Sequence, residues 1–118
     1  MEITINGLVY VPKGTETAAR VSPDGLKMVM IRSGQSGVHF GWLKSHENGT
    51  VELIDSRRVW YWAGAASLSQ LAMEGSSKLD ECKIAMELPE ITVLGVCEII
   101  PMWNAAFVNL GKAKPWKL

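Results

Sequence analysis

The dipeptide Asn48-Gly49, with strand-forming residues on both sides, constrains the fold of this chain more than any other feature. Both residue types tolerate the positive φ angles of a two-residue turn, so Asn-Gly is the strongest short-range signal for a β-hairpin. In the arm before the turn, alternation assigns two sets of residues to opposite faces of a strand: Val38, Phe40 and Trp42, and His39, Gly41 and Leu43. We expect this hairpin to be the centre of a sheet.

The arm after the turn runs from Thr50 to Trp62 and is rich in β-branched and aromatic residues. A period of two divides its end into two sets on opposite sides of the strand: Arg58, Trp60 and Trp62, and Arg57, Val59 and Tyr61. The arm therefore carries arginine and aromatic side chains on both of its faces.

Other segments have the pattern of shorter strands. Apolar runs occupy residues 26–31, 83–86 and 91–101, and a weaker strand pattern lies within residues 3–11. Residues 34–37 contain two glycines and two small polar residues and read as a turn. Together with the hairpin, these segments predict an antiparallel β-sheet or a small, partly open barrel.

One or two short helices complete the predicted fold. Ser67 and Gln70 have the spacing of a capping box, which predicts a helix from about Leu68 to Glu74. A last helix is expected over residues 103–110, with Asn104 as its candidate cap. Strands and helices in this order predict the α+β class.

The length of 118 residues is typical of a single domain. Residues 12–25 collect Gly, Pro, Thr, Ser and Asp with few apolar side chains, which is the composition of a loop. We therefore expect a loosely ordered N-terminal extension over residues 1–25, a core over residues 26–110, and a basic tail over residues 111–118.

Charge and composition narrow the classes of function. Twelve Lys and Arg balance twelve Asp and Glu, so no global positive field favours duplex nucleic acid. No segment approaches the roughly 18 apolar residues of a membrane helix, and no secretory signal opens the chain, so we expect a cytoplasmic protein. Cys82 and Cys97 have no zinc spacing with the two histidines, and no glycine-rich cofactor motif is present, so neither a metal nor a cofactor is expected.

The segment from Arg57 to Gln70 contains the densest collection of recognition chemistry. A strand delivers guanidinium and indole groups, a corner of small residues allows close backbone approach, and a helix N-terminus follows. This arrangement suits a phosphate with a base stacked beside it. The candidate ligand-binding residues are Arg57, Arg58, Trp60, Trp62, Ala65, Ser67, Ser69 and Gln70, with His39 and Phe40 from the preceding strand. The alternative is structural, with both tryptophans in the core and Ser67 and Gln70 acting only as helix caps.

His39 has two interpretations. With Ser36 and Asp55 it could form a hydrolase-like triad, although no G-x-S-x-G motif is present. Alternatively, it borders a ligand site or lies on the sheet surface. We expect no catalytic residue and no enzymatic activity.

Two stretches resemble a widespread family of small phage and prophage proteins. They are Gly37 to Gly41 and Arg57 to Ala65, the second followed by Ser67 to Ala72. The resemblance extends from about Lys27 to Ile100, and the extension before Leu26 departs from it. Many members of that family have no assigned function. The chain also looks similar to phage counter-defence sponges of the Thoeris anti-defence type, which hold cyclic nucleotide or cyclic ADP-ribose signals between subunits without cleaving them.

The resemblance implies a counter-defence protein in the cytoplasm of an infected bacterial host. Such a protein would bind and sequester a small cyclic nucleotide or cyclic ADP-ribose type signal without cleaving it. Because nanomolar binding requires about 12 kcal/mol, which a shared subunit interface supplies more easily, a homo-oligomer is expected.

Three alternatives remain open. The chain could be an inhibitor of a host defence complex, like an anti-CRISPR protein, that binds through an aromatic patch of Trp42, Trp60 and Trp62. It could also be a structural phage module, or a nucleotide hydrolase that uses His39.

Overall fold

The computed structural model describes residues 3–5, 8–10 and 19–118 of the chain. Strands β1 (Ile3–Ile5) and β2 (Leu8–Tyr10) pair as an antiparallel hairpin, where the sequence predicted one weak strand. The loop predicted over residues 12–25 lies partly outside the described residues. Where residues 19–25 are described, Arg20 and Ser22 make backbone hydrogen bonds to Met102 and Leu26.

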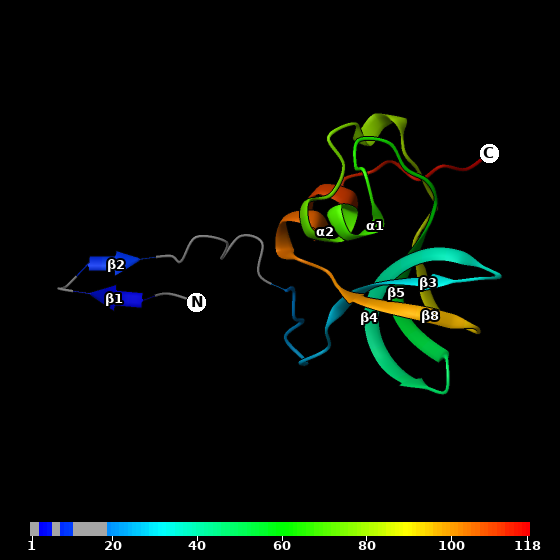
Figure 1. The fold of residues 1–118 in the computed structure, drawn as a ribbon, viewed down its shortest axis with the longest axis horizontal. Helices are drawn as coiled ribbons and strands as arrows, with labels where there is room; N and C mark the ends of the chain where they lie inside the picture. The colour runs from blue at the N-terminus through cyan, green and yellow to red at the C-terminus, as the bar shows by residue number, and fades with distance from the viewer. Residues whose placement is uncertain (1–2, 6–7, 11–18) are drawn as a thin grey trace.

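The main body is an antiparallel sheet of six strands with two short helices, as expected for the α+β class (Figure 1). Its strands are listed in chain order: β3 (Met28–Ser33), β4 (Gly37–Glu47), β5 (Thr50–Tyr61), β6 (Lys83–Ile84), β7 (Leu88–Val93) and β8 (Val96–Pro101). The order in the sheet is β6-β5-β4-β3-β8, and β7 also pairs with β5. The sheet does not close into a barrel.

The predicted hairpin joins β4 and β5. Asn48 and Gly49 have φ angles of 50° and 79°. These positive values confirm the prediction of a tight turn, because Asn and Gly are the residues that adopt them most easily. Glu47 pairs with Thr50 on either side of it. The longest pair of strands in the sheet is therefore defined by a local signal.

The sheet is strongly curled. Strand β7 pairs with β5, whereas the next strand, β8, pairs with β3, although only Leu94 and Gly95 connect them. The two edges of the sheet therefore approach each other at this turn, and the amide of Val96 donates to the carbonyl of Gly49. The prediction of one continuous strand over residues 91–101 was wrong, because Gly95 turns the chain with a φ of 67°.

Helices α1 (Leu68–Glu74) and α2 (Asn104–Gly111) pack on one face of the sheet (Figure 1). A short 3-10 turn, η2 (Leu79–Glu81), follows α1. The bounds of α1 agree with the prediction. The prediction that Asn104 caps α2 was wrong: the N-cap residue is Trp103, and the Asn104 side chain accepts a hydrogen bond from Arg20. None of the helices that the structure describes is long and apolar enough to span a membrane.

Two hydrophobic clusters lie on opposite faces of the sheet, and β4 contributes Phe40 to one and Leu43 to the other, in agreement with the predicted alternation. The larger one joins the helices to the sheet through residues such as Met30, Phe40 and Val59. The smaller one lies inside the curl and is formed by Val29, Ile31, Val51, Leu53 and Val93. The curled interior is thus an apolar core of its own.

A β-bulge interrupts β5. Asp55 and Ser56 together oppose Gly41, between the pairs Phe40 with Arg57 and Trp42 with Ile54. Asp55 adopts a φ of 49° to make this possible. The bulge leaves Ser56 and Arg58 on the curled side of the sheet and Arg57 on the helix side.

Candidate functional site

The two adjacent arginines have different environments. Arg57 is only 7% exposed, and its guanidinium donates to the carbonyl oxygens of Ala85, Leu110, Ile84 and Ala113. Burial lowers the pKa of Arg57, and the charge of Glu87 opposes that effect. Arg57 therefore ties the C-terminal segment to the sheet. The prediction that Arg57 binds a phosphate was wrong, because its N–H groups already donate to backbone carbonyl oxygens.

The corner after β5 is also mainly structural. Trp62 is half-buried against the helix-side cluster and donates to the carbonyl of Ala65. It therefore does not lie beside Trp60, contrary to the prediction, because the strand ends at Tyr61. Ser67 accepts from the amide of Gln70, and the side chain of Gln70 accepts from Ala66, so both stabilise the start of α1.

Two other candidates do not join a common site. Ser69 is exposed on α1, which has seven residues. Phe40 is 3% exposed and packs in the helix-side cluster, on the opposite face of β4 from His39. Of the ten predicted site residues, the structure brings His39 and Arg58 together on the curled side of the sheet.

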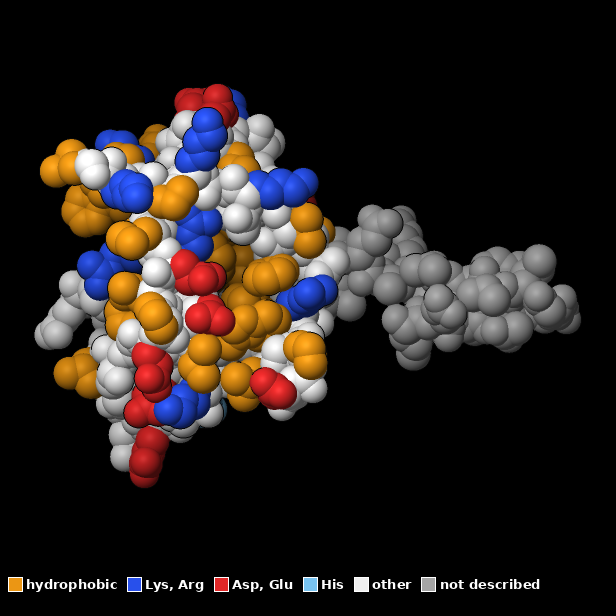
Figure 2. Space-filling model, turned by 180° about the vertical axis from the view of Figure 1, so that it is seen from behind, with side chains coloured by type: hydrophobic (Ala, Val, Ile, Leu, Met, Phe, Trp, Pro, Cys, Tyr) orange, Lys and Arg blue, Asp and Glu red, His pale blue; other side chains and the backbone are white. Residues whose placement is uncertain are grey.

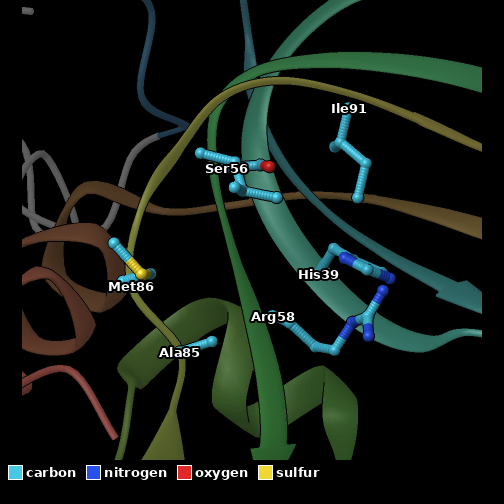
Figure 3. A pocket seen from close by; sticks show the side chains of 7 residues that line it. His39, Ser56, Arg58, Ala85, Met86 and Ile91 are labelled. Atoms are coloured by element: carbon cyan, nitrogen blue, oxygen red, sulfur yellow. The ribbon is translucent and has the colours of Figure 1, made fainter. Parts of the chain in front are cut away.

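A pocket of about 200 Å³ opens at one end of the curled interior (Figure 3). We call it the His39 pocket. Its lining comes from β4, β5 and the β6–β7 segment: His39, Ser56, Arg58, Ala85, Met86, Leu88 and Ile91. The pocket exists because β6 and β7 pair with different parts of β5. Residues 85–87 leave the sheet between the two ladders and form one wall.

His39 is buried and neutral at physiological pH. It is 1% exposed, and its Nε2 atom lies 3.1 Å from the carbonyl oxygen of Ser36 and 3.3 Å from the Ser36 hydroxyl. Burial, with the positive charge of Arg58, lowers the pKa of His39 to about 4. Figure 3 shows the Arg58 guanidinium beside the imidazole ring. The pocket therefore presents one cation and one neutral imidazole.

Ser56 is the second polar group of the pocket. It is 1% exposed, and its hydroxyl has no hydrogen-bond partner in the described part of the chain. The hydroxyl points into the space between Ile91 and His39 (Figure 3). A buried hydroxyl without a partner costs about 1–3 kcal/mol, so the group invites a ligand atom or a water molecule.

An aromatic surface lies at the end of β5, two residues beyond Arg58. Trp60 is 64% exposed and stacks on Trp116, which is 50% exposed, with ring centroids 6.0 Å apart and planes at 13°. The Nζ atom of Lys83 lies 5.3 Å from the centre of the Trp116 ring. We call these three residues the aromatic shelf. Arg57 holds the tail in place by its bond to Ala113, so the shelf depends on that buried guanidinium.

A second, larger hollow of about 410 Å³ lies between the sheet and α2. Aromatic side chains such as Trp42 and Phe107 line it, together with the carboxylates of Asp55 and Glu87. Figure 2 shows acidic side chains beside a broad hydrophobic area on the back of the molecule. Arg57 also lines this hollow, but its guanidinium is bonded to backbone carbonyl oxygens and the two carboxylates repel an anion, so the His39 pocket is the better candidate for a phosphate-bearing ligand.

The triad alternative is not assembled. His39 contacts Ser36, but Asp55 lines the hollow on the helix side, across the sheet from the imidazole. Within residues 3–5, 8–10 and 19–118, no group of three or more His, Cys, Asp or Glu side chains is placed to hold a metal ion.

Residues 26–110 match a family described as a domain of unknown function, DUF6948. The chain belongs to the DUF6948 family. No curated protein and no solved structure matches the chain. The DUF6948 region contains every residue that lines the His39 pocket, whereas Trp116 of the aromatic shelf lies beyond its C-terminal end.

Sequence reasoning missed three kinds of residue in this site. Ser56 is an ordinary small residue in a strand, and Met86 and Ile91 belong to segments whose pairing partners are not encoded locally. Trp116 was noticed only as part of a basic tail. The available signal was its indole, since a tryptophan side chain has a large apolar area to bury.

Proposed function

We propose that this protein binds a small nucleotide-derived anion at Arg58 and holds it without cleaving it. The observation that carries the proposal is the environment of Arg58. Its guanidinium lines the His39 pocket, and the two salt bridges of the described residues, Arg32 with Glu98 and Lys44 with Glu90, do not involve it. An exposed cation at the edge of a pocket, without a carboxylate partner, is suited to a phosphate.

The neighbouring groups support a nucleotide in particular. Trp60 follows Arg58 by two residues, so their Cα atoms lie roughly 7 Å apart along β5. Stacking of a base on an exposed indole contributes about 1–3 kcal/mol. Lys83 adds a second positive charge beside the Trp116 ring. A nucleotide would use both the charge of Arg58, which binds its phosphate, and the aromatic shelf, on which its base stacks.

Binding without turnover agrees with the chemistry of the pocket. The His39 Nε2 atom faces a backbone carbonyl and the Ser36 hydroxyl, and no carboxylate orients the ring within the described residues. A pKa of about 4 also makes the imidazole a weak base. These features favour a binding protein over a nucleotide hydrolase.

We further propose a second copy of the chain as the other wall of the site. A volume of about 200 Å³ is below the roughly 300–1,000 Å³ of pockets that enclose a ligand. Met86 and Leu88 at its rim are 52% and 44% exposed and offer apolar area to a neighbouring subunit. In this proposal the protein is a phage-encoded counter-defence protein. It would sequester a cyclic nucleotide or cyclic ADP-ribose type signal in the cytoplasm of the infected host.

Calorimetric titration tests the proposal. The wild-type protein is titrated with cyclic dinucleotides, cyclic trinucleotides and cyclic ADP-ribose, and the bound compound is recovered after heat denaturation and identified by mass spectrometry. We expect submicromolar binding of at least one compound, its recovery intact, and loss of binding in Arg58→Ala. Arg32→Ala is the matched control, because Arg32 is ion-paired with Glu98 outside the pocket. Absence of binding to the whole panel would refute the proposal.

The exposed aromatic residues favour a second candidate, an inhibitor that binds a host defence protein. Trp60, Tyr61 and Trp116 are each at least half exposed. This surface replaces the predicted patch of Trp42, Trp60 and Trp62, since Trp42 and Trp62 pack against the helix-side cluster. If tagged protein retains one host protein from infected cells, and Trp116→Ala releases it while nucleotides do not, this candidate replaces the first.

A further inference from the structure

We propose that the His39 pocket binds the terminal pentose of a nucleoside diphosphate sugar, such as ADP-ribose, through hydrogen bonds to the hydroxyl groups of that pentose. The inference rests on the proposed function and specifies the ligand of the same site. It comes from three features of the structure: the order of groups along β5, the hydrogen-bonding capacity of the pocket floor, and the size of the pocket.

The order of side chains along β5 matches one order of chemical groups. Ser56 and Arg58 both line the pocket and Trp60 follows two residues later, so the three residues span about 13 Å of β5 at 3.3 Å per residue. They present a hydroxyl in the pocket, a guanidinium at its edge and an indole beyond it. A mononucleotide has the order phosphate, sugar, base, which would leave the pocket empty. A pentose joined through phosphates to a nucleoside has the order pentose, phosphates, ribose, base, so its pentose, phosphates and base can meet the three positions in turn.

The pocket floor can both accept and donate a hydrogen bond. The Ser36 carbonyl oxygen can only accept, so the neutral His39 ring carries its proton on Nε2 and leaves Nδ1 as an acceptor. The Nδ1 atom has no hydrogen bond to another described residue. The buried Ser56 hydroxyl, which also has no described partner, can donate or accept. Adjacent hydroxyl groups of a pentose satisfy both groups, because each hydroxyl is a donor and an acceptor.

The size of the pocket agrees with a sugar. A volume of about 200 Å³ is small beside the roughly 300–1,000 Å³ of pockets that enclose a whole drug-sized ligand, so it suits one sugar ring of a larger ligand. The remaining walls are apolar side chains of Ala85, Met86 and Ile91. Such walls suit the C–H faces of a sugar ring, so the polar and apolar parts of the pocket both have a counterpart on the ligand.

The test compares ADP-ribose with ADP, which lacks the terminal pentose, by calorimetry on the wild-type protein and on Ser56→Ala. We expect the wild type to bind ADP-ribose about tenfold more tightly than ADP, and Ser56→Ala to remove most of that difference while binding ADP unchanged. Ser45→Ala, at an exposed serine of the same sheet, is the control and should keep the difference. Ser56→Ala should also unfold at higher denaturant concentration than the wild type, because it removes a buried hydroxyl without a partner.

The outcomes separate this inference from the proposed function. Equal binding of ADP and ADP-ribose by the wild type, or a preference that survives in Ser56→Ala, overturns the pentose assignment and leaves the nucleotide site intact. Failure of both compounds and of the cyclic panel overturns the proposed function as well. Loss of ADP binding in Ser56→Ala would show that the serine supports the whole site and would also overturn the assignment.

Discussion

Lowering the pH from 7.5 to 5 should destabilise this protein by about 2 kcal/mol through His39 alone. The imidazole is buried beside Arg58, and its pKa is lowered from 6.5 to about 4. In the unfolded chain the same group binds a proton near pH 6.5, so below that pH protons favour the unfolded state. At pH 5 the imidazole is almost fully protonated when unfolded and about one-tenth protonated when folded, which corresponds to about 2 kcal/mol.

Urea denaturation followed by tryptophan fluorescence at several pH values between 7.5 and 5 measures this loss. His39→Gln keeps a donor toward the Ser36 carbonyl but does not titrate, so its free energy of unfolding should vary much less with pH. His46→Gln is the control at an exposed histidine of the hairpin and should behave like the wild type. The reasoning fails if the wild type keeps constant stability over this range, or if His39→Gln loses as much as the wild type.

Three substitutions test other parts of the structure by chemical denaturation. Ser67→Ala removes the side-chain cap of α1 and should cost about 1 kcal/mol, whereas the exposed Ser69→Ala should be neutral. Gly41→Ala places a Cβ 2.9 Å from the Cβ of Ser56 and 3.0 Å from its Cα, which should cost about 1–3 kcal/mol and narrow the His39 pocket. Arg57→Met removes the hydrogen bonds to four carbonyl oxygens, of which only those of Ile84 and Leu110 keep a backbone donor among the described residues; the change should cost about 3 kcal/mol and alter the fluorescence of the Trp60–Trp116 pair. A loss below about 0.5 kcal/mol in Ser67→Ala, Gly41→Ala or Arg57→Met would contradict the role assigned to that residue.

The candidate site was predictable only in part. Alternation along β4 and β5 correctly separated His39 from Phe40 and Arg58 from Arg57, because side chains in a strand point to opposite faces in turn. The pattern did not show which face meets the helices, so it could not choose between the two arginines. That choice depends on the packing of α1 and α2 against Phe40 and Val59.

Local chemistry determined the hairpin, the first helix and the α+β class from the sequence alone. Asn48-Gly49 has few alternatives to a tight turn, and Ser67 with Gln70 stabilises a helix start through bonds that span three and four residues. These signals operate within a few residues and need no other part of the chain.

Only the tertiary structure decided where the edges of the sheet and the C-terminal tail lie. The pairing of β7 with β5 and the stacking of Trp116 on Trp60 join residues that are far apart in the sequence. The carbonyl oxygens that bind Arg57 likewise come from segments 27 to 56 residues away. Such contacts form where buried area and hydrogen bonds offset the entropy of closing long loops, and no short pattern in the sequence records that balance.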